Sequence, residues 1–277
     1  MLTRLLAVAV LTATASAAAQ SSRTLSDDDW CDDTAEWSDG ETACEVRETV
    51  LSARRLSVDA GPMGGATIKA WDRPDVLVRA RVVAGARTQR EADRLLDATV
   101  IETQNGQIRS RQPRDVRGAH ASGRWVAVSY EVFAPRRTDA AVRAVNGGVG
   151  IHGLHGALRA EAVNGGVALS DVAGAVRART TNGGVSVTLA GDRWVGEGLD
   201  VESTNGGITL TLPDGYSADL TATTRMGRIT TPGLALRDAR RAEGRWTGDE
   251  LTARIGDGGP RLRVATVNGG VSIRHDR

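Results

Sequence analysis

Apolar and polar residues alternate with a period of two along most of the chain, and the tripeptide Asn-Gly-Gly interrupts this alternation repeatedly. The tripeptide occurs five times, and each copy is followed by Val or Ile. Positions −6, −4 and −2 before each Asn are apolar or small, and positions +3 and +5 after it are apolar. A period of two is typical of strands that bury one face. Each unit is therefore predicted to be a strand, an Asn-Gly-Gly turn and a second strand.

The copies recur at a spacing that suits one such unit. The Asn residues of the complete turns are Asn146, Asn164, Asn182, Asn205 and Asn268; Asn105 begins a degenerate copy, and Met63 and Met226 take the place of Asn in two others. Two strands of six residues at about 3.3 Å per residue, with their turns, account for a unit of about 20 residues. A fixed period of this length is typical of solenoids and arrays.

Two architectures could use these units. An antiparallel meander is one, because Asn-Gly is a strong hairpin signal. The other is a parallel β-solenoid in which each unit is one coil and equivalent positions stack. The small residue before every turn favours the solenoid, and stacked Asn side chains could form a hydrogen-bonded ladder. The glycines are expected to provide positive φ at the bend.

Charged residues at position −3 alternate in sign through four consecutive units, as Arg143, Glu161, Arg179 and Glu202. In a parallel stack these side chains would be neighbours at about 4.8 Å, where opposite charges attract. The alternation therefore predicts a charge ladder on the solvent face.

One segment departs from the β pattern. Residues 88–98 are good helix formers with Thr88 at a plausible N-cap, which predicts one short helix as an excursion or cap. The fold class that follows is all-β, with one such helix.

The N-terminus predicts export. Residues 1–19 combine Arg4, an apolar run and a small-residue end, the pattern of a secretory signal peptide. The two cysteines, Cys31 and Cys44, then read as one disulfide in an exported protein. Residues 20–50 are predicted to form an acidic, disulfide-pinned cap, and residues 51–277 the repeat domain. No transmembrane span is expected in the mature chain.

The segment Cys44–Glu48 and the run Ala70–Val76, together with the Thr-x-Asn-Gly-Gly-Val repeats, resemble the bacterial DUF4097 family of adhesin-like proteins. The resemblance covers about residues 44–277. It implies an exported β-solenoid with no catalytic residues to carry over.

Composition gives little support for chemistry. The net charge is +1, so general polyanion binding has no support. Nucleic acid is not an expected partner of an exported protein. His152 and His155 lie three residues apart, but a structural turn is favoured over a metal site because no third ligand is near in sequence. No cofactor, metal or catalytic residue is expected. Candidate binding residues are Trp194, in an inserted loop where it could stack on a sugar or pack over the coil edge, and Arg111, Arg114 and Arg117.

These observations predict a non-enzymatic, adhesin-like binding module that presents a rigid, repetitive β surface. Its partner would be a protein or glycan on the cell envelope or another surface, and its location the periplasm, the cell surface or the medium. A periplasmic scaffold or sensing protein is the alternative, and a glycan-active enzyme on a β-helix is the third.

Overall fold

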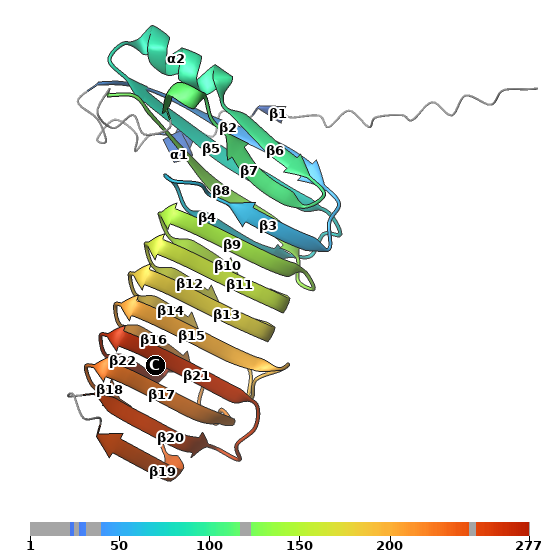
Figure 1. Cartoon of the computed structure of the whole chain (residues 1–277). Helices are drawn as coiled ribbons and strands as arrows, with labels where there is room; N and C mark the ends of the chain where they lie inside the picture. Colours follow the sequence, from blue (N-terminus) through green and yellow to red (C-terminus); the bar gives the residue numbers. More distant parts are fainter. Residues whose placement is uncertain (1–22, 25–27, 32–39, 117–122, 244–247, 277) are drawn as a thin grey trace, which may run out of the picture.

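The computed structural model of the chain describes residues 23–24, 28–31, 40–116, 123–243 and 248–276. Within these residues the fold is all-β, with two large, mostly parallel sheets stacked face to face along a common axis (Figure 1). The predicted signal peptide lies outside the described residues.

Each sheet has eleven described strands. The first sheet contains, in spatial order, β1 (Arg23–Thr24), β2 (Glu41–Leu51), β5 (Val76–Ala86), β8 (Trp125–Pro135), β4 (Ala66–Trp71), β10 (Val149–His152), β12 (Val167–Ser170), β14 (Val185–Thr188), β16 (Ile208–Leu212), β22 (Val271–His275) and β18 (Ile229–Thr230). The second contains β19 (Leu236–Glu243), β20 (Asp249–Ile255), β17 (Ala218–Met226), β21 (Arg261–Asn268), β15 (Gly198–Asn205), β13 (Ala173–Asn182), β11 (His155–Asn164), β9 (Asp139–Asn146), β3 (Arg55–Asp59), β7 (Gln107–Arg111) and β6 (Val100–Gln104).

Each Asn-Gly-Gly unit contributes one strand to each sheet, and the turn carries the chain from the second sheet to the first. Units pair in parallel with equivalent positions in register, so Asn146, Asn164 and Asn182 align with Asn205 and Asn268. The antiparallel meander is therefore wrong for these units. The apolar positions before and after each turn face inward, and the core between the sheets consists mainly of Val, Leu, Ile and Ala. Thin units of this kind need few aromatic side chains.

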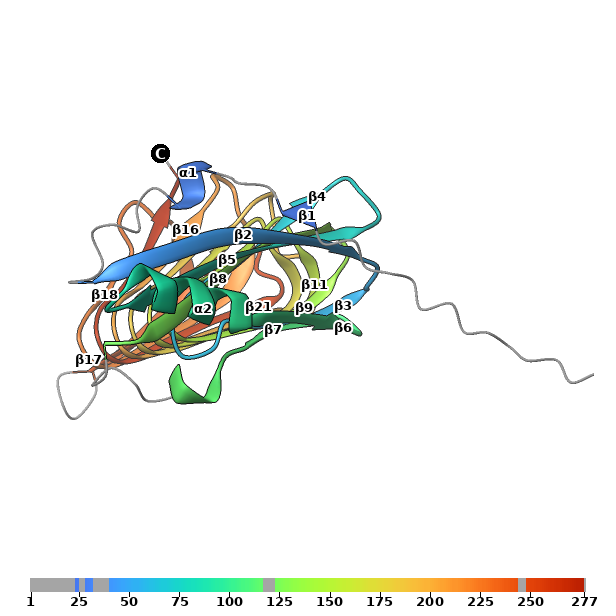
Figure 2. The same ribbon diagram turned by 90° about the horizontal axis from the view of Figure 1, so that it is seen from above.

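The N-terminal end of the stack is covered by different elements. β2, β5 and β8 form an antiparallel extension of the first sheet. The helix α2 (Gln89–Ala98) packs on β5 and β2, as Figure 2 shows from above. Its residues Ala92 and Leu95 are buried. The antiparallel hairpin β6–β7 extends the second sheet at the same end. We call the elements from β5 to β8 in the chain, together with β2, the N-terminal cap.

Asn105 does not belong to the stacked turns. It lies at the tip of the β6–β7 hairpin with a φ of 52°, followed by Gly106 at 73°. Left-handed φ at both positions is what a two-residue hairpin turn requires. This degenerate copy of the motif, Asn-Gly-Gln, therefore joins antiparallel neighbours.

The prediction that the glycines of the stacked turns adopt positive φ is wrong for most of them, and close approach explains their presence. A Cβ at the first glycine, Gly165, would lie 2.1 Å from the carbonyl oxygen of Gly147 in the neighbouring unit. A Cβ at the second glycine, Gly166, would lie 3.3 Å from the nearest atom. The first glycine thus allows the units to stack at strand spacing.

The disulfide between Cys31 and Cys44 is present, with a Cα–Cα distance of 5.8 Å. It ties the short helix α1 (Asp28–Cys31) to β2. Trp30 of α1 lies over the guanidinium of Arg79, 5.4 Å from the ring centre. This segment is thus attached to the outer face of the first sheet.

Candidate binding site

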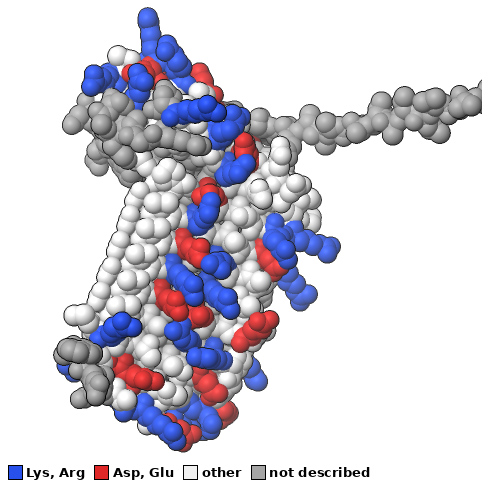
Figure 3. All heavy atoms as spheres, viewed as in Figure 1, with Lys and Arg blue, Asp and Glu red and all other residues white. Residues whose placement is uncertain are grey.

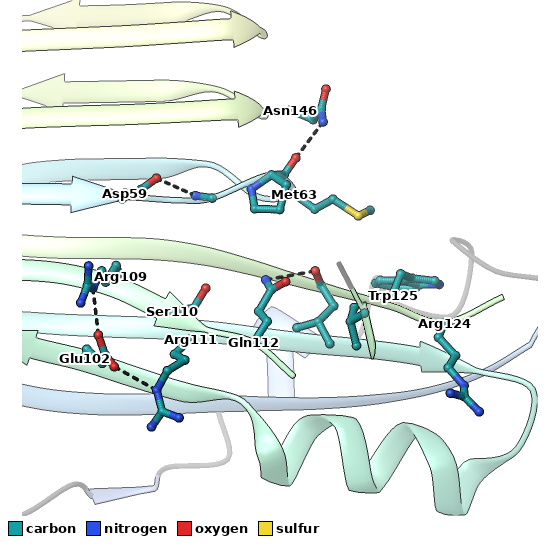
Figure 4. A pocket seen from close by; sticks show the side chains of 14 residues that line it. Asp59, Met63, Glu102, Arg109, Ser110, Arg111, Gln112, Arg124, Trp125 and Asn146 are labelled. Atoms are coloured by element: carbon teal, nitrogen blue, oxygen red, sulfur yellow. Dashed lines mark hydrogen bonds and ion pairs between the residues drawn. The ribbon is translucent and has the colours of Figure 1, made fainter. Parts of the chain in front are cut away.

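A cavity of about 710 Å³ lies where the N-terminal cap meets the first stacked unit. We call it the junction pocket. Figure 4 shows Asp59, Met63 and Asn146 on the side of the stacked units, and Glu102, Arg109 and Arg111 on the side of the cap. The pocket therefore exists only because the hairpin β6–β7 and the strand β8 are brought against the segment that follows β3.

Glu102 is held between two arginines. Its carboxylate accepts hydrogen bonds from Arg109 Nε at 2.8 Å and Arg111 Nε at 3.0 Å. The hairpin register explains the arrangement, because Glu102 lies directly opposite Arg109 and Arg111 is two residues further on the same face. The hydrogen bonds from Arg109 and Arg111 lower the pKa of Glu102 below its ordinary value. The group is therefore ionised at neutral pH.

Asp59 is the second carboxylate of the pocket. Partial burial by itself raises the pKa of Asp59, but the hydrogen bond from Arg143, the backbone N–H of Gly61 and the charge of Arg143 outweigh it and lower the pKa overall. The Gly61 amide donates to Asp59 Oδ1 at 3.0 Å. Both carboxylates of the junction pocket are thus fixed in place and charged.

Trp125 gives the pocket an aromatic side chain. It faces Gly85 on the neighbouring strand β5, and a Cβ at residue 85 would lie 2.2 Å from the indole atoms Cε2 and Nε1. Only glycine at this position lets the ring lie so close to the sheet. The side chain is partly exposed. Nearby, Gln112 Nε2 donates to the carbonyl of Val126 at 3.4 Å, and Arg124 pairs with Glu91 of α2.

Two further hollows continue from the junction pocket along the second sheet. One of about 680 Å³ shares Asp59, Gly61 and Pro62 with the junction pocket, and another of about 510 Å³ shares Glu202 and Thr204 with the first hollow. We call these two hollows the axial groove. Exposed side chains that directly precede the turn Asn residues line the axial groove. They include Val145 and Val163, which are 41% and 43% exposed.

The predicted charge-ladder residues line this groove in register. Arg143, Glu161, Arg179 and Glu202 are successive neighbours across four strands. Arg179 pairs with Glu202 at 3.1 Å, whereas Arg143 pairs with Asp59, and Glu161 pairs with Arg159 of its own strand. Figure 3 shows both signs of charge mixed in a band along this face. The wall of the groove is therefore close to neutral.

The turn Asn side chains form a continuous ladder at one edge of the stack. Nδ2 of each Asn donates to Oδ1 of the preceding one: 2.8 Å for Asn164 to Asn146, 2.8 Å for Asn182 to Asn164, 2.9 Å for Asn205 to Asn182 and 2.7 Å for Asn268 to Asn205. Asn146 donates instead to the carbonyl of Pro62 at 2.7 Å, because the preceding unit in the stack has Met63 at the Asn position.

The idea of an exposed Trp194 is wrong. Its side chain is 3% exposed, and Nε1 donates to the carbonyl of Gly174 at 3.1 Å. The residue packs over the edge of the neighbouring unit and offers no ring to a ligand. Its indole is amphipathic, so the inserted loop can bury the ring once the N–H finds a backbone partner.

Of the two predicted binding arginines that the structure describes, Arg111 lines the junction pocket and Arg114 does not. Arg114 lies in a 3-10 turn (Arg114–Val116) and is exposed, and Arg117 falls outside the described residues. Sequence analysis did not identify Asp59, Glu102 and Trp125 as parts of one site. They lie on three separate strands, and only the register between those strands shows that they line the same pocket.

His152 and His155 lie at one end of the stacked units and point to different partners. His152 Nδ1 is 2.7 Å from Ser170 Oγ, and burial with the nearby charge of Lys69 lowers the pKa of His152. His155 Nε2 is 3.3 Å from Arg136 Nη1. In the described part of the chain, no three His, Cys, Asp or Glu side chains come together as a cation site.

No protein-family model and no curated protein sequence matches the chain. Solved structures with some likeness include a "putative cell adhesion protein" from Clostridium sporogenes, at 12% identity and a TM-score of 0.47, covering 85% of this chain and all of that one. A "putative adhesin" from Bacteroides fragilis has 10% identity, a TM-score of 0.38 and coverage of 83% and 97%. A "putative lipid binding protein" from Parabacteroides distasonis has 10% identity, a TM-score of 0.33 and coverage of 86% and 98%.

Among the described residues, no helix has the length and apolar character needed to cross a membrane.

Proposed function

We propose that this chain is an exported, non-enzymatic binding module whose stacked units form a parallel β-solenoid, and that it binds an oligosaccharide at the junction pocket. The observation that carries the proposal is the pocket itself. Fixed carboxylates (Asp59 and Glu102), guanidinium groups (Arg109 and Arg111) and an aromatic ring (Trp125) meet in one cavity. The in-register stacking of equivalent positions supports the solenoid, and the disulfide is consistent with export.

The chemistry of the lining suits hydroxyl groups. A sugar hydroxyl both donates and accepts hydrogen bonds, so it can bond to a carboxylate and to a guanidinium at once. The apolar C–H face of a sugar ring can pack on an indole, which is apolar over most of its surface. Among the described residues, three arginines and two carboxylates line the cavity, and this mixed lining favours a neutral or weakly acidic sugar over a polyanion.

The pocket supports binding more than hydrolysis. Glycoside hydrolysis by two carboxyl groups requires one of them to stay protonated as a general acid, with a raised pKa. The pKa values of Asp59 and Glu102 are both lowered, and each group is held by arginine. Neither group is suited to donate a proton to a leaving group.

The test is a glycan-array screen of the mature chain, followed by titration calorimetry with the sugars that bind. Replacing Trp125 with Ala, or Gln112 with Ala, should weaken binding at least tenfold, while each variant keeps its β-sheet circular dichroism. Gln107→Ala is the matched control, because Gln107 is an exposed glutamine on β7 that does not line the pocket. Absence of binding across the array, or equal losses in the control, would overturn the proposed site.

A periplasmic scaffold is the second candidate function. It is supported by the long outer face of the second sheet, where charges of both signs are mixed and another envelope protein could dock. Protease digestion of intact and permeabilised cells separates the two. Digestion on intact cells, or protein in the medium, supports the surface-binding module. Protection until the outer envelope is opened supports the scaffold, whose partner cross-linking would then identify.

A further inference from the structure

The last two strands of the chain lie out of sequence order in the stack. β21 pairs in parallel with β15 on one side and β17 on the other, and β22 lies between β16 and β18 in the same way. The chain therefore forms β15–β16, leaves a gap one unit wide, forms β17–β18, and returns at its C-terminus to fill the gap (Figure 1). We call residues 261–275 the C-terminal unit and the gap that they fill the slot.

The C-terminal unit joins two parts of the molecule. Its inward side chains Leu262, Val264, Val271 and Ile273 are fully or almost fully buried. Toward β15, Arg263 Nη1 is 2.6 Å from Asp200 Oδ1 and Asn268 continues the ladder. Toward β17, Thr224 Oγ1 donates to the Gly269 carbonyl at 2.8 Å. An empty slot would leave the strands on both of its sides, in both sheets, with unpaired backbone N–H and C=O groups. These groups strongly favour pairing with another strand.

The C-terminal unit follows β20 through one short link, which would act as its hinge. Its link to β20 is the segment Gly256–Pro260, in which Gly256, Gly258 and Gly259 have φ values of 57°, 80° and 145°. A short connection in a conformation that only glycine adopts easily is a natural hinge. If the segment Gly256–Pro260 straightened, these positive φ values would no longer be required.

We propose that the slot is a self-association site: the C-terminal unit of one copy occupies the slot of a second copy. Every contact of the unit with β15–β18 is available in the same form from another chain, so exchange costs no interface. Within one chain the short hinge keeps the unit at high effective concentration, so the closed monomer dominates when folding is dilute. Folding at high protein concentration, with several chains present at once, yields exchanged dimers or longer assemblies.

Exchange would join copies of the module and therefore multiply any weak binding that each copy has. This consequence rests on the proposed function, but the exchange itself does not. The slot and its occupant are complete without a ligand, so the test uses only the protein.

The experiment mixes two variants that each carry one added cysteine beside the native Cys31–Cys44 pair, Thr209→Cys and Ser272→Cys, and refolds them together. Thr209 and Ser272 are register partners on the outer face of the first sheet. Cα atoms of such partners are about 4.8 Å apart, within the range that a disulfide spans. Only exchange between copies brings the two engineered cysteines together, so a covalent heterodimer on a non-reducing gel reports it.

The matched control mixes Ala168→Cys and Ser186→Cys, which are register partners in the consecutive units β12 and β14. These units lie inside the stack and have no free chain end. We expect the heterodimer from the slot pair to rise at least fivefold between dilute and concentrated refolding, while the control stays flat. Equal heterodimer in both mixtures, or none in the slot pair at any concentration, would overturn the proposal.

A hinge variant tests the same idea without new cysteines. A Cβ at Gly256 would lie 2.4 Å from Ser217 Oγ in the closed form, so Gly256→Ala should strain the monomer and raise the dimer fraction in size-exclusion chromatography. Gly215→Ala is the control, because Gly215 has a φ of 74° with open space around it and lies outside the hinge. A dimer fraction that rises equally in both variants would assign the effect to general destabilisation and contradict the proposal.

Discussion

The two glycines of a stacked turn should respond very differently to substitution, and the unit at Asn182 shows the contrast clearly. A Cβ at Gly183 would lie 2.2 Å from the carbonyl oxygen of Gly165 and 2.6 Å from its carbon. A Cβ at Gly184 would lie 3.3 Å from the nearest atom, the carbonyl oxygen of Gly207. The perturbation is the same methyl group one residue apart in the chain.

The magnitude follows from what must move. An ordinary C···O contact is about 3.3 Å, so Gly183→Ala requires the neighbouring units to separate locally by about 1 Å. Both sides of the clash are backbone, and rotation of a side chain cannot relieve it. Overpacking of this kind costs about 1–3 kcal/mol. Separation of these two units also weakens the bond from the Gly165 amide to the Asn182 carbonyl, now 3.0 Å, which adds about 1 kcal/mol.

Gly184→Ala should be close to neutral. The methyl group makes one tight contact, and the loss of glycine flexibility in the unfolded chain stabilises the fold by about 0.4–1 kcal/mol. A difference of about 3 kcal/mol between the two variants is therefore expected. For a domain of this size it corresponds to about 6–12 °C in Tm.

Thermal unfolding followed by circular dichroism is the assay, with Gly165→Ala and Gly166→Ala as a repeat of the comparison one unit away. The order of stability should be the same in both units. If Gly183→Ala and Gly184→Ala melt within 2 °C of each other, about the shift expected for a difference below 1 kcal/mol, close stacking does not explain the first glycine.

Three further predictions concern the disulfide, the Asn ladder and the pocket carboxylates. Replacing Cys31 and Cys44 with Ser should lower the free energy of unfolding by about 3 kcal/mol, because the disulfide closes a short loop in the unfolded chain. Guanidinium denaturation measures this loss, and an unchanged midpoint would contradict the prediction. Asn182→Ala removes two side-chain hydrogen bonds at a solvent-exposed edge and should lower Tm by about 2–4 °C; a shift as large as that of Gly183→Ala would mean that the ladder matters more than its exposure suggests. The folded pKa of Asp59 is below its ordinary 3.8, so its stabilising effect is complete above that value and is lost as the pH falls through the folded pKa. The stability difference between the native chain and Asp59→Asn should accordingly be constant from pH 5 to 8 and shrink below about pH 4; a difference that already changes between pH 6 and 7 would rule out this group as the cause.

Much of the repeated structure can be predicted from the sequence, because its causes are local. The alternation around each turn predicts two strands with one buried face, and these appear as β9–β10, β11–β12 and the units that follow. The pattern of residues 88–98 predicts a short helix, and the structure has one at Gln89–Ala98. Helix and strand periodicities are properties of short segments, so a single sequence carries them.

Other features depend on which segments become neighbours, and only the tertiary structure decided them. The C-terminal unit has the same local pattern as every other unit, so nothing in residues 261–275 says that they fill a gap between β15 and β17. Asn105 carries the turn motif but lies in a hairpin, because its neighbours pair antiparallel.

The candidate site shows the same division. The sequence marked an arginine-rich segment, and Arg111 does line the junction pocket. It did not show that Trp125 would lie against Gly85, or that Trp194 would be buried over Gly174. Strand propensity is set by each residue and its near neighbours, whereas a pocket and a buried ring are set by the register between strands far apart in the chain. That register is a property of the assembled sheets, and a local pattern does not contain it.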